Sequence, residues 1–185
     1  PGEWSERYTR YYARKYVRML GAEELHDAIA SATDRPGSFG PRKRKTTAAN
    51  AEEAELTQTV PMAMQVAVPS PTGELKSFMQ AFGQANREQF DRQPGGSVLQ
   101  AMMLMNHPFV TRRVQATNNS RVEQLIKSAK SNAEIIEELY LATLSRHPLP
   151  QEKQLALTWL DQDRKQGAED LHWGLLNKLD FVFNY

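Results

Sequence analysis

The sequence predicts an all-α fold, an irregular multi-helix bundle, from two observations. Apolar residues recur at helical spacing through most of the 185 residues, with breaks at Gly, Pro, Asn and Ser. Only one segment alternates in the manner of a strand, and it lies between prolines. We therefore expect helices with one short extended segment, around Val60–Val68, and one flexible loop, over residues 35–59.

Composition and charge limit the possible functions. A net charge of +1, with 40% apolar and 24% charged residues, is ordinary for a globular protein, so we expect no nucleic-acid partner. The chain has no cysteine, which excludes disulfides, thiolate zinc sites, covalent c-type haem and cysteine nucleophiles. No apolar run approaches the roughly 18 residues of a membrane helix, so no membrane span is predicted. We expect residues 1–185 to form one helical domain, the C-terminal fragment of a larger protein.

Residues 4–18 combine tyrosines on one helical face with arginines and lysine on the other. This pattern could bind phosphate or stack nucleic-acid bases. Because the net charge is close to zero, the preferred interpretation is an amphipathic helix whose long cations cover apolar surface.

The stretch from Leu20 to Ala30 predicts a second helix, which the residues Thr33 to Gly37 end. Glu23, His26 and Asp27 share one face of it, and they could ligate a metal. No further ligand stands at the spacing of a zinc signature, so we predict a local hydrogen-bonded cluster, which could include a neighbouring arginine, and no metal.

The predicted loop, residues 35–59, contains the basic run Arg42–Lys45, which could bind polyanions or direct localisation. Acidic residues follow closely, so a solvated loop is the preferred interpretation. The extended segment Val60–Val68 comes next, and we expect it to lie against the helices.

The most apolar part of the chain follows a helix predicted from Thr72 to Gly83. Ser97 and Gln100 form a capping box at the start of the next helix. Nearly every residue from 98 to 105 is apolar, which predicts a helix buried on most sides. His107-Pro108 ends or kinks it.

The last third gives the clearest helical pattern. A helix around Val114, a turn at residues 118–120 and a helix at residues 122–126 precede the capping box Ser131–Glu134. The helix that begins there extends to Leu144, and another is expected from Pro150 to near Gly167. A final helix over residues 171–179 leads into an aromatic end that we expect to be covered.

No motif for catalysis or cofactor binding stands out. The four histidines lack a nucleophile motif such as G-x-S-x-G, and the glycine turns lack the continuation of a phosphate loop. His107 with Met102, Met103 and Met105 could ligate haem or copper, but methionines on a core helix more often fill gaps. We expect no catalytic residue, metal or cofactor in this segment.

Several segments together resemble one family. The resemblance covers most of the chain from Leu20 onward and rests on these stretches: L-G-A-E-E-L-H-D-A-I from Leu20, V-P-M-A-M-Q from Val60, F-M-Q-A-F-G-Q-A-N-R from Phe78, S-V-L-Q-A-M-M-L-M-N-H-P-F-V from Ser97, L-S-R-H-P from Leu144 and W-G-L-L-N-K-L-D-F-V-F-N-Y from Trp173. They are similar to the planctomycete-specific domain of unknown function 1553. Asp180 stands where that family more often has Glu, and the family's portion before Trp4 is missing.

The resemblance implies a setting and no catalytic residue. Members of the family form the C-terminal module of large secreted bacterial proteins, commonly with a planctomycete-type cytochrome c domain and another uncharacterised domain. It implies a periplasmic or extracellular location. It also implies a setting of electron transfer or polysaccharide degradation. The implied partners are upstream domains of the same chain.

Two functions remain open from the sequence. The first is a non-catalytic helical module that packs against the rest of its parent chain or a partner. The second is a glycan-related enzyme or ligand-binding module, whose small-molecule or glycan ligand the sequence does not identify. For the second, the candidate ligand-binding residues are the polar ones within the family-like segments: Glu23, His26, Asp27, Arg87, Asn106 and His107.

Overall fold

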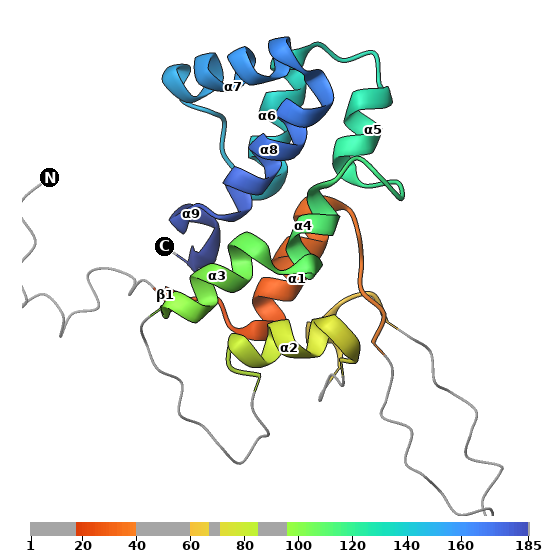
Figure 1. The fold of residues 1–185 in the computed structure, drawn as a ribbon, viewed down its shortest axis with the longest axis vertical. Helices are drawn as coiled ribbons and strands as arrows, with labels where there is room; N and C mark the ends of the chain where they lie inside the picture. Colours follow the sequence, from red (N-terminus) through yellow and green to blue (C-terminus); the bar gives the residue numbers. More distant parts are fainter. Residues whose placement is uncertain (1–17, 40–59, 67–70, 85–95, 185) are drawn as a thin grey trace, which may run out of the picture.

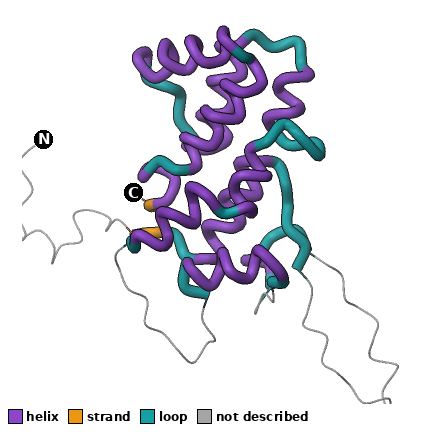
Figure 2. The backbone as a smooth tube through the Cα atoms, viewed as in Figure 1, coloured by secondary structure: helices purple, strands orange, loops and turns teal. Residues whose placement is uncertain are grey.

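The computed structural model describes residues 18–39, 60–66, 71–84 and 96–184. The predicted all-α fold is confirmed, as Figures 1 and 2 show. The elements are, in order, β1 (Arg18–Met19), α1 (Ala22–Thr33), the 3₁₀ helix η3 (Ala63–Gln65), α2 (Gly73–Ala81), α3 (Val98–Asn106), α4 (Pro108–Val114), α5 (Arg121–Lys127), α6 (Asn132–Leu144), α7 (Pro150–Gln162), α8 (Arg164–Leu176), α9 (Leu179–Val182) and β2 (Phe183–Asn184).

The helices pack around two neighbouring hydrophobic clusters. The first cluster lies among α1, α2, α3, α4 and the C-terminal end, and it contains Phe78, Phe109 and Phe181. The second lies among α5, α6, α7 and α8, and it contains Ile135, Leu139 and Leu160. Leu144 contacts both clusters, and Figure 1 shows α8 passing from the upper helices down toward α4 and α9.

The two strands lie outside the segment predicted to be extended. β1 and β2 pair antiparallel, with Arg18 opposite Asn184 and Met19 opposite Phe183. Phe181 and Val182 are buried, which confirms that the aromatic end is covered. Of the predicted extended segment, residues 60–66 are described: Val60 bridges Phe39, and the 3₁₀ helix η3 follows at Ala63. Residues 40–59, with the basic run, lie outside the described residues, as does the tyrosine-rich stretch before Arg18.

The predicted capping boxes are confirmed. Ser97 Oγ accepts from the Gln100 backbone N–H at 3.2 Å, and Gln100 Oε1 accepts from Ser97 N at 2.9 Å. Ser131 and Glu134 make the same reciprocal pair at the start of α6. These bonds satisfy backbone donors that a helix N-terminus otherwise leaves without partners.

The boundaries of α7 and α8 differ from the prediction, since α8 extends from Arg164 to Leu176 and not over residues 171–179. The helix expected to close near Gly167 ends at Gln162, because Asp163 caps the next helix by accepting from Lys165 N and Gln166 N, both at 2.9 Å. Gly167 therefore lies inside α8. A Cβ there would come within 2.6 Å of the Trp159 carbonyl carbon, so glycine permits the close crossing of α7 and α8.

The prediction that the apolar helix α3 is buried on most sides is wrong. Within α3 only Leu104 is buried, and several large apolar side chains are solvent-exposed. One stripe of the helix packs on the first cluster through Leu104 and Met103, and the other large apolar side chains of the helix remain largely exposed. Apolar content alone could not indicate which side lacks a neighbour.

Candidate functional site

Asp27 links helix α1 to the turn η3. Its Oδ1 lies 2.8 Å from His26 Nδ1 and accepts from Ala63 N at 2.7 Å, while its Oδ2 accepts from Met64 N at 2.9 Å. The predicted hydrogen-bonded cluster on α1 is present in part, because His26 and Asp27 are hydrogen-bonded to each other and Glu23 is hydrogen-bonded to neither. Its further partner is the backbone of η3 and not an arginine, so the carboxylate caps this turn in the way a helix N-cap does.

His26 is fully buried between two aromatic rings. Its ring centroid lies 4.8 Å from that of Phe39, edge to face, and 5.3 Å from that of Phe109, stacked. Burial lowers the pKa of His26, although the Asp27 hydrogen bond opposes this, so the ring is neutral at pH 7. A Cβ at Gly37 would lie 2.9 Å from the ring, which shows that His26 has no open face for a ligand.

We predict that Asp27→Ala opens the turn η3 without unfolding the domain. The variant removes the acceptor of two backbone N–H groups, each held by a charge-assisted bond. Amide hydrogen exchange at Ala63 and Met64 should accelerate about tenfold, which corresponds to about 1.4 kcal/mol of local stability. Glu23→Ala, on the same helix, is the control and should leave both rates unchanged; equal rates in Asp27→Ala would contradict this role.

His107 joins α3 to α4. Its Nδ1 accepts from Phe109 N at 3.2 Å, so its Nε2 carries the proton and donates to Ser77 Oγ at 3.1 Å. Burial lowers the pKa of His107, opposed by Glu74. The neighbouring Asn106 is exposed and donates to Met102 O at 3.2 Å.

The structure does not gather the six candidate residues at one cleft. Glu23, His26 and Asp27 share α1, and Asn106 and His107 lie at the junction of α3 and α4. Arg87 lies outside the described residues. None of the described five lines either of the two best-formed surface clefts, so their binding of a ligand stays a prediction. Within the described ranges, no group of three or more His, Asp or Glu side chains is placed to hold a metal.

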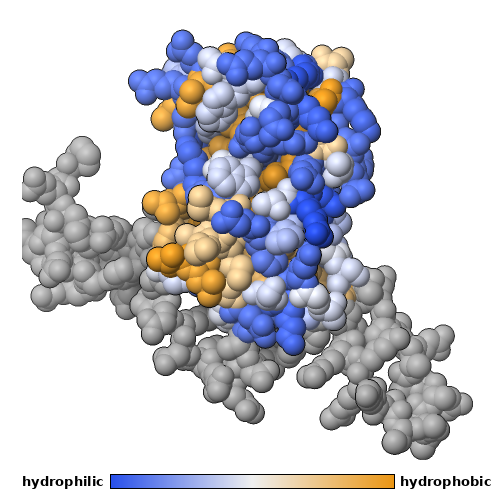
Figure 3. Space-filling view, in the orientation of Figure 1, coloured by the Kyte–Doolittle hydropathy of each residue, from blue (hydrophilic) through white to orange (hydrophobic). Residues whose placement is uncertain are grey.

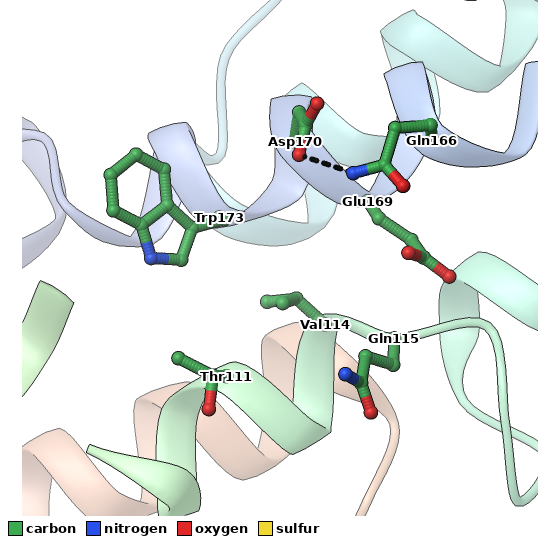
Figure 4. Close-up of a pocket in the computed structure, with 7 residues that line it drawn as sticks. All are labelled: Thr111, Val114, Gln115, Gln166, Glu169, Asp170 and Trp173. Carbon is green, nitrogen blue, oxygen red and sulfur yellow. Dashed lines mark hydrogen bonds between the residues drawn. The ribbon is translucent and has the colours of Figure 1, made fainter. Parts of the chain in front are cut away.

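A cleft of about 360 Å³ lies between α4 and α8 (Figure 4). Its α4 side consists of Thr111, Val114 and Gln115. Its α8 side consists of Gln166, Glu169, Asp170 and Trp173. Gln166, Asp170 and Trp173 stand at i, i+4 and i+7, so a single helix face carries an indole among polar groups. The sequence therefore places these three residues on one helix face, but it does not show that α4 forms the opposite wall of the cleft.

Two backbone contacts fix the walls of this cleft. Glu169 Oε1 accepts from Ala116 N at 2.8 Å, which ties the segment after α4 to α8. The Trp173 indole donates to Met105 O at 3.0 Å, which holds its ring at the other end. Asp170 Oδ1 accepts from Gln166 Nε2 at 2.8 Å, as the dashed line in Figure 4 shows.

The second feature is an exposed apolar face on α3, which we call the α3 face. It consists of four side chains with large exposed fractions: Val98 (79%), Leu99 (54%), Met102 (57%) and Met105 (45%). Positions i, i+1, i+4 and i+7 lie on one side of a helix, so the four are contiguous. Figure 3 shows the apolar side chains gathered over α3, at the lower left of the view. Contiguous apolar surface of this kind is typical of a contact site.

In the part of the chain that the structure describes, fold and surface together define a helical module with an exposed apolar face and a polar cleft. The chain belongs to the PSD1 family, described as "Protein of unknown function (DUF1553)", whose family model matches residues 3–160. No curated protein and no solved structure matches the chain. Among the described residues, no helix has the length and apolar character to cross a membrane.

Proposed function

We propose that this chain is a non-catalytic packing module of a large secreted bacterial protein. Its α3 face docks on upstream domains of the same chain, in the periplasm or outside the cell. The observation that supports the proposal is the exposed α3 face. In addition, helix α3 contains no charged residue. The resemblance to planctomycete-type proteins that contain cytochrome c domains suggests the identity of the parent protein.

The exposed side chains of the α3 face would gain free energy from burial. Full burial of a Leu, Val or Met side chain contributes about 1.5–3 kcal/mol relative to exposure. The four side chains are each roughly half or more exposed, so docking would recover part of this from every one. Methionines adapt their shape to a partner surface, and two of the four are methionine.

We predict that Leu99→Glu weakens binding of the separately expressed upstream part of the parent chain by more than tenfold. The substitution places a charge in a surface that would be desolvated on docking. Calorimetric titration of the unmodified chain should give a negative heat-capacity change, the sign of apolar burial.

Leu155→Glu provides a matched control, because Leu155 on α7 has the same exposed fraction, 54%. It should bind like the unmodified chain. Absence of binding by the unmodified chain, or equal weakening by both variants, would refute the assignment of the α3 face.

A ligand-binding module, acting on a glycan or a related secreted substrate, is the second candidate. The cleft between α4 and α8 favours it, because an aromatic ring and several polar side chains converge there. NMR titration with a panel of oligosaccharides tests it. Saturable shifts at the cleft or at the candidate residues would support it, and their absence for every sugar would argue against it.

A further inference from the structure

We infer that the cleft between α4 and α8 binds a planar organic cation, namely a guanidinium group. This inference does not depend on the α3 face. It rests on the charge of the cleft, on its indole ring and on the arrangement of its hydrogen-bond acceptors.

The charge of the cleft is negative and uncompensated. Glu169 and Asp170 are its only charged lining residues, and neither takes part in an ion pair within the described ranges. Each carboxylate uses one oxygen in the contacts given above, Glu169 to Ala116 N and Asp170 to Gln166 Nε2. The second oxygen of each is left to accept from a ligand. A cation held there would gain charge-assisted hydrogen bonds.

The indole of Trp173 adds a second reason for a cation. The ring is half-buried and anchored through its N–H to Met105 O, so it is held in place before any ligand arrives. An indole face attracts cations, most often the guanidinium group of arginine. Asp170 stands one turn before Trp173 on α8, so a cation near the ring would also be within reach of that carboxylate.

The acceptors favour guanidinium over ammonium. Guanidinium presents five N–H donors in one plane, whereas ammonium is a compact point charge. Gln166 donates its amide N–H to Asp170, which leaves Gln166 Oε1 as a further acceptor beside the carboxylates. The volume of about 360 Å³ lies within the range of ligand pockets, about 300–1,000 Å³, and accommodates an arginine side chain.

The test compares ethylguanidinium with ethylurea, which has a similar planar shape and no charge, by NMR titration of the ¹⁵N-labelled 185-residue chain at low salt. Ethylguanidinium should cause saturable shifts of the Trp173 indole N–H, identified from its loss in Trp173→Phe, and of the Gln115 and Gln166 side-chain amides. Ethylurea should cause none. The double variant Glu169→Gln with Asp170→Asn should weaken binding at least fivefold, because both substitutions keep an oxygen acceptor and remove the charge.

Asp161→Asn is the control, since it removes a carboxylate outside the cleft and should bind like the unmodified chain. Equal shifts from ethylurea, no saturable shift with ethylguanidinium, or equal weakening by Asp161→Asn would each overturn the inference. A blocked Gly-Arg-Gly peptide distinguishes the source of the guanidinium. Binding tighter than that of ethylguanidinium would indicate a partner's arginine, and equal affinity a free small molecule.

Discussion

Gly167→Ala is expected to lower the free energy of unfolding by about 3 kcal/mol, at the upper end of the usual cost of overpacking. A Cβ at this position would lie 2.6 Å from the Trp159 carbonyl carbon and 2.7 Å from the Trp159 oxygen and the Leu160 nitrogen. All three are backbone atoms of α7, so no side-chain rotation can relieve the overlap. The helices α7 and α8 would have to separate along a crossing that contributes to the second hydrophobic cluster.

Thermal unfolding followed by circular dichroism measures this effect. For a chain of this size about 3 kcal/mol corresponds to a fall in Tm of roughly 6–12 °C. Gly174→Ala is the matched control on the same helix, because a Cβ there would meet no atom within 4 Å. That substitution should leave Tm unchanged or raise it, since alanine favours a helix interior over glycine by about 0.5–1 kcal/mol. Because helix propensity alone would raise Tm in both variants, similar losses in both would show that the close α7–α8 crossing at Gly167 does not determine the effect.

The fold was predictable from the sequence where local chemistry specifies it. Capping pairs such as Ser97–Gln100 satisfy backbone donors within a few residues, and these helix starts are confirmed. Gly167 shows the limit of this approach. From its sequence neighbours, Gly167 predicts the end of a helix. In the structure it lies inside α8, where the absence of a side chain permits close contact with Trp159 of α7. The strand pair β1–β2 joins opposite ends of the described chain, so neighbouring residues carry no signal for it.

The site was less predictable, because it depends on what each helix face meets. Of the cluster predicted for Glu23, His26 and Asp27, the His26–Asp27 hydrogen bond is present, and only the tertiary structure shows that Asp27 caps η3. Trp173 was noted as part of a helix but not as part of a cleft, since the opposite wall belongs to α4. The α3 sequence predicted burial because it is apolar, whereas within α3 only Leu104 is buried and four large apolar side chains are exposed.

The second large effect is a loss of stability on mild acidification, governed by His172. This side chain is fully buried on α8, and neither ring nitrogen has a hydrogen-bond partner. Burial, with a smaller contribution from the charge of Arg121, lowers the pKa of His172 to about 3. In the unfolded chain the pKa is about 6.5, so the unfolded state binds one more proton as the pH falls below that value. The native state should therefore lose about 2 kcal/mol between pH 7 and pH 5.

Urea unfolding at pH 7, 6 and 5 tests this prediction. In this pH range histidines contribute to the change in stability, whereas carboxylates contribute mainly at lower pH. Glu152, whose pKa the Arg146 hydrogen bond lowers to about 2, loses its contribution only below its unfolded value of 4.5. His172→Leu should raise stability at pH 7 by about 1 kcal/mol, because it removes buried polar atoms without partners. It should also flatten the pH dependence, leaving a smaller slope in the same direction from His26 and His107, whose pKa values burial also lowers. The exposed His147 provides the control: His147→Gln should keep the full slope, and an unchanged slope in His172→Leu would show that another group governs the acid sensitivity.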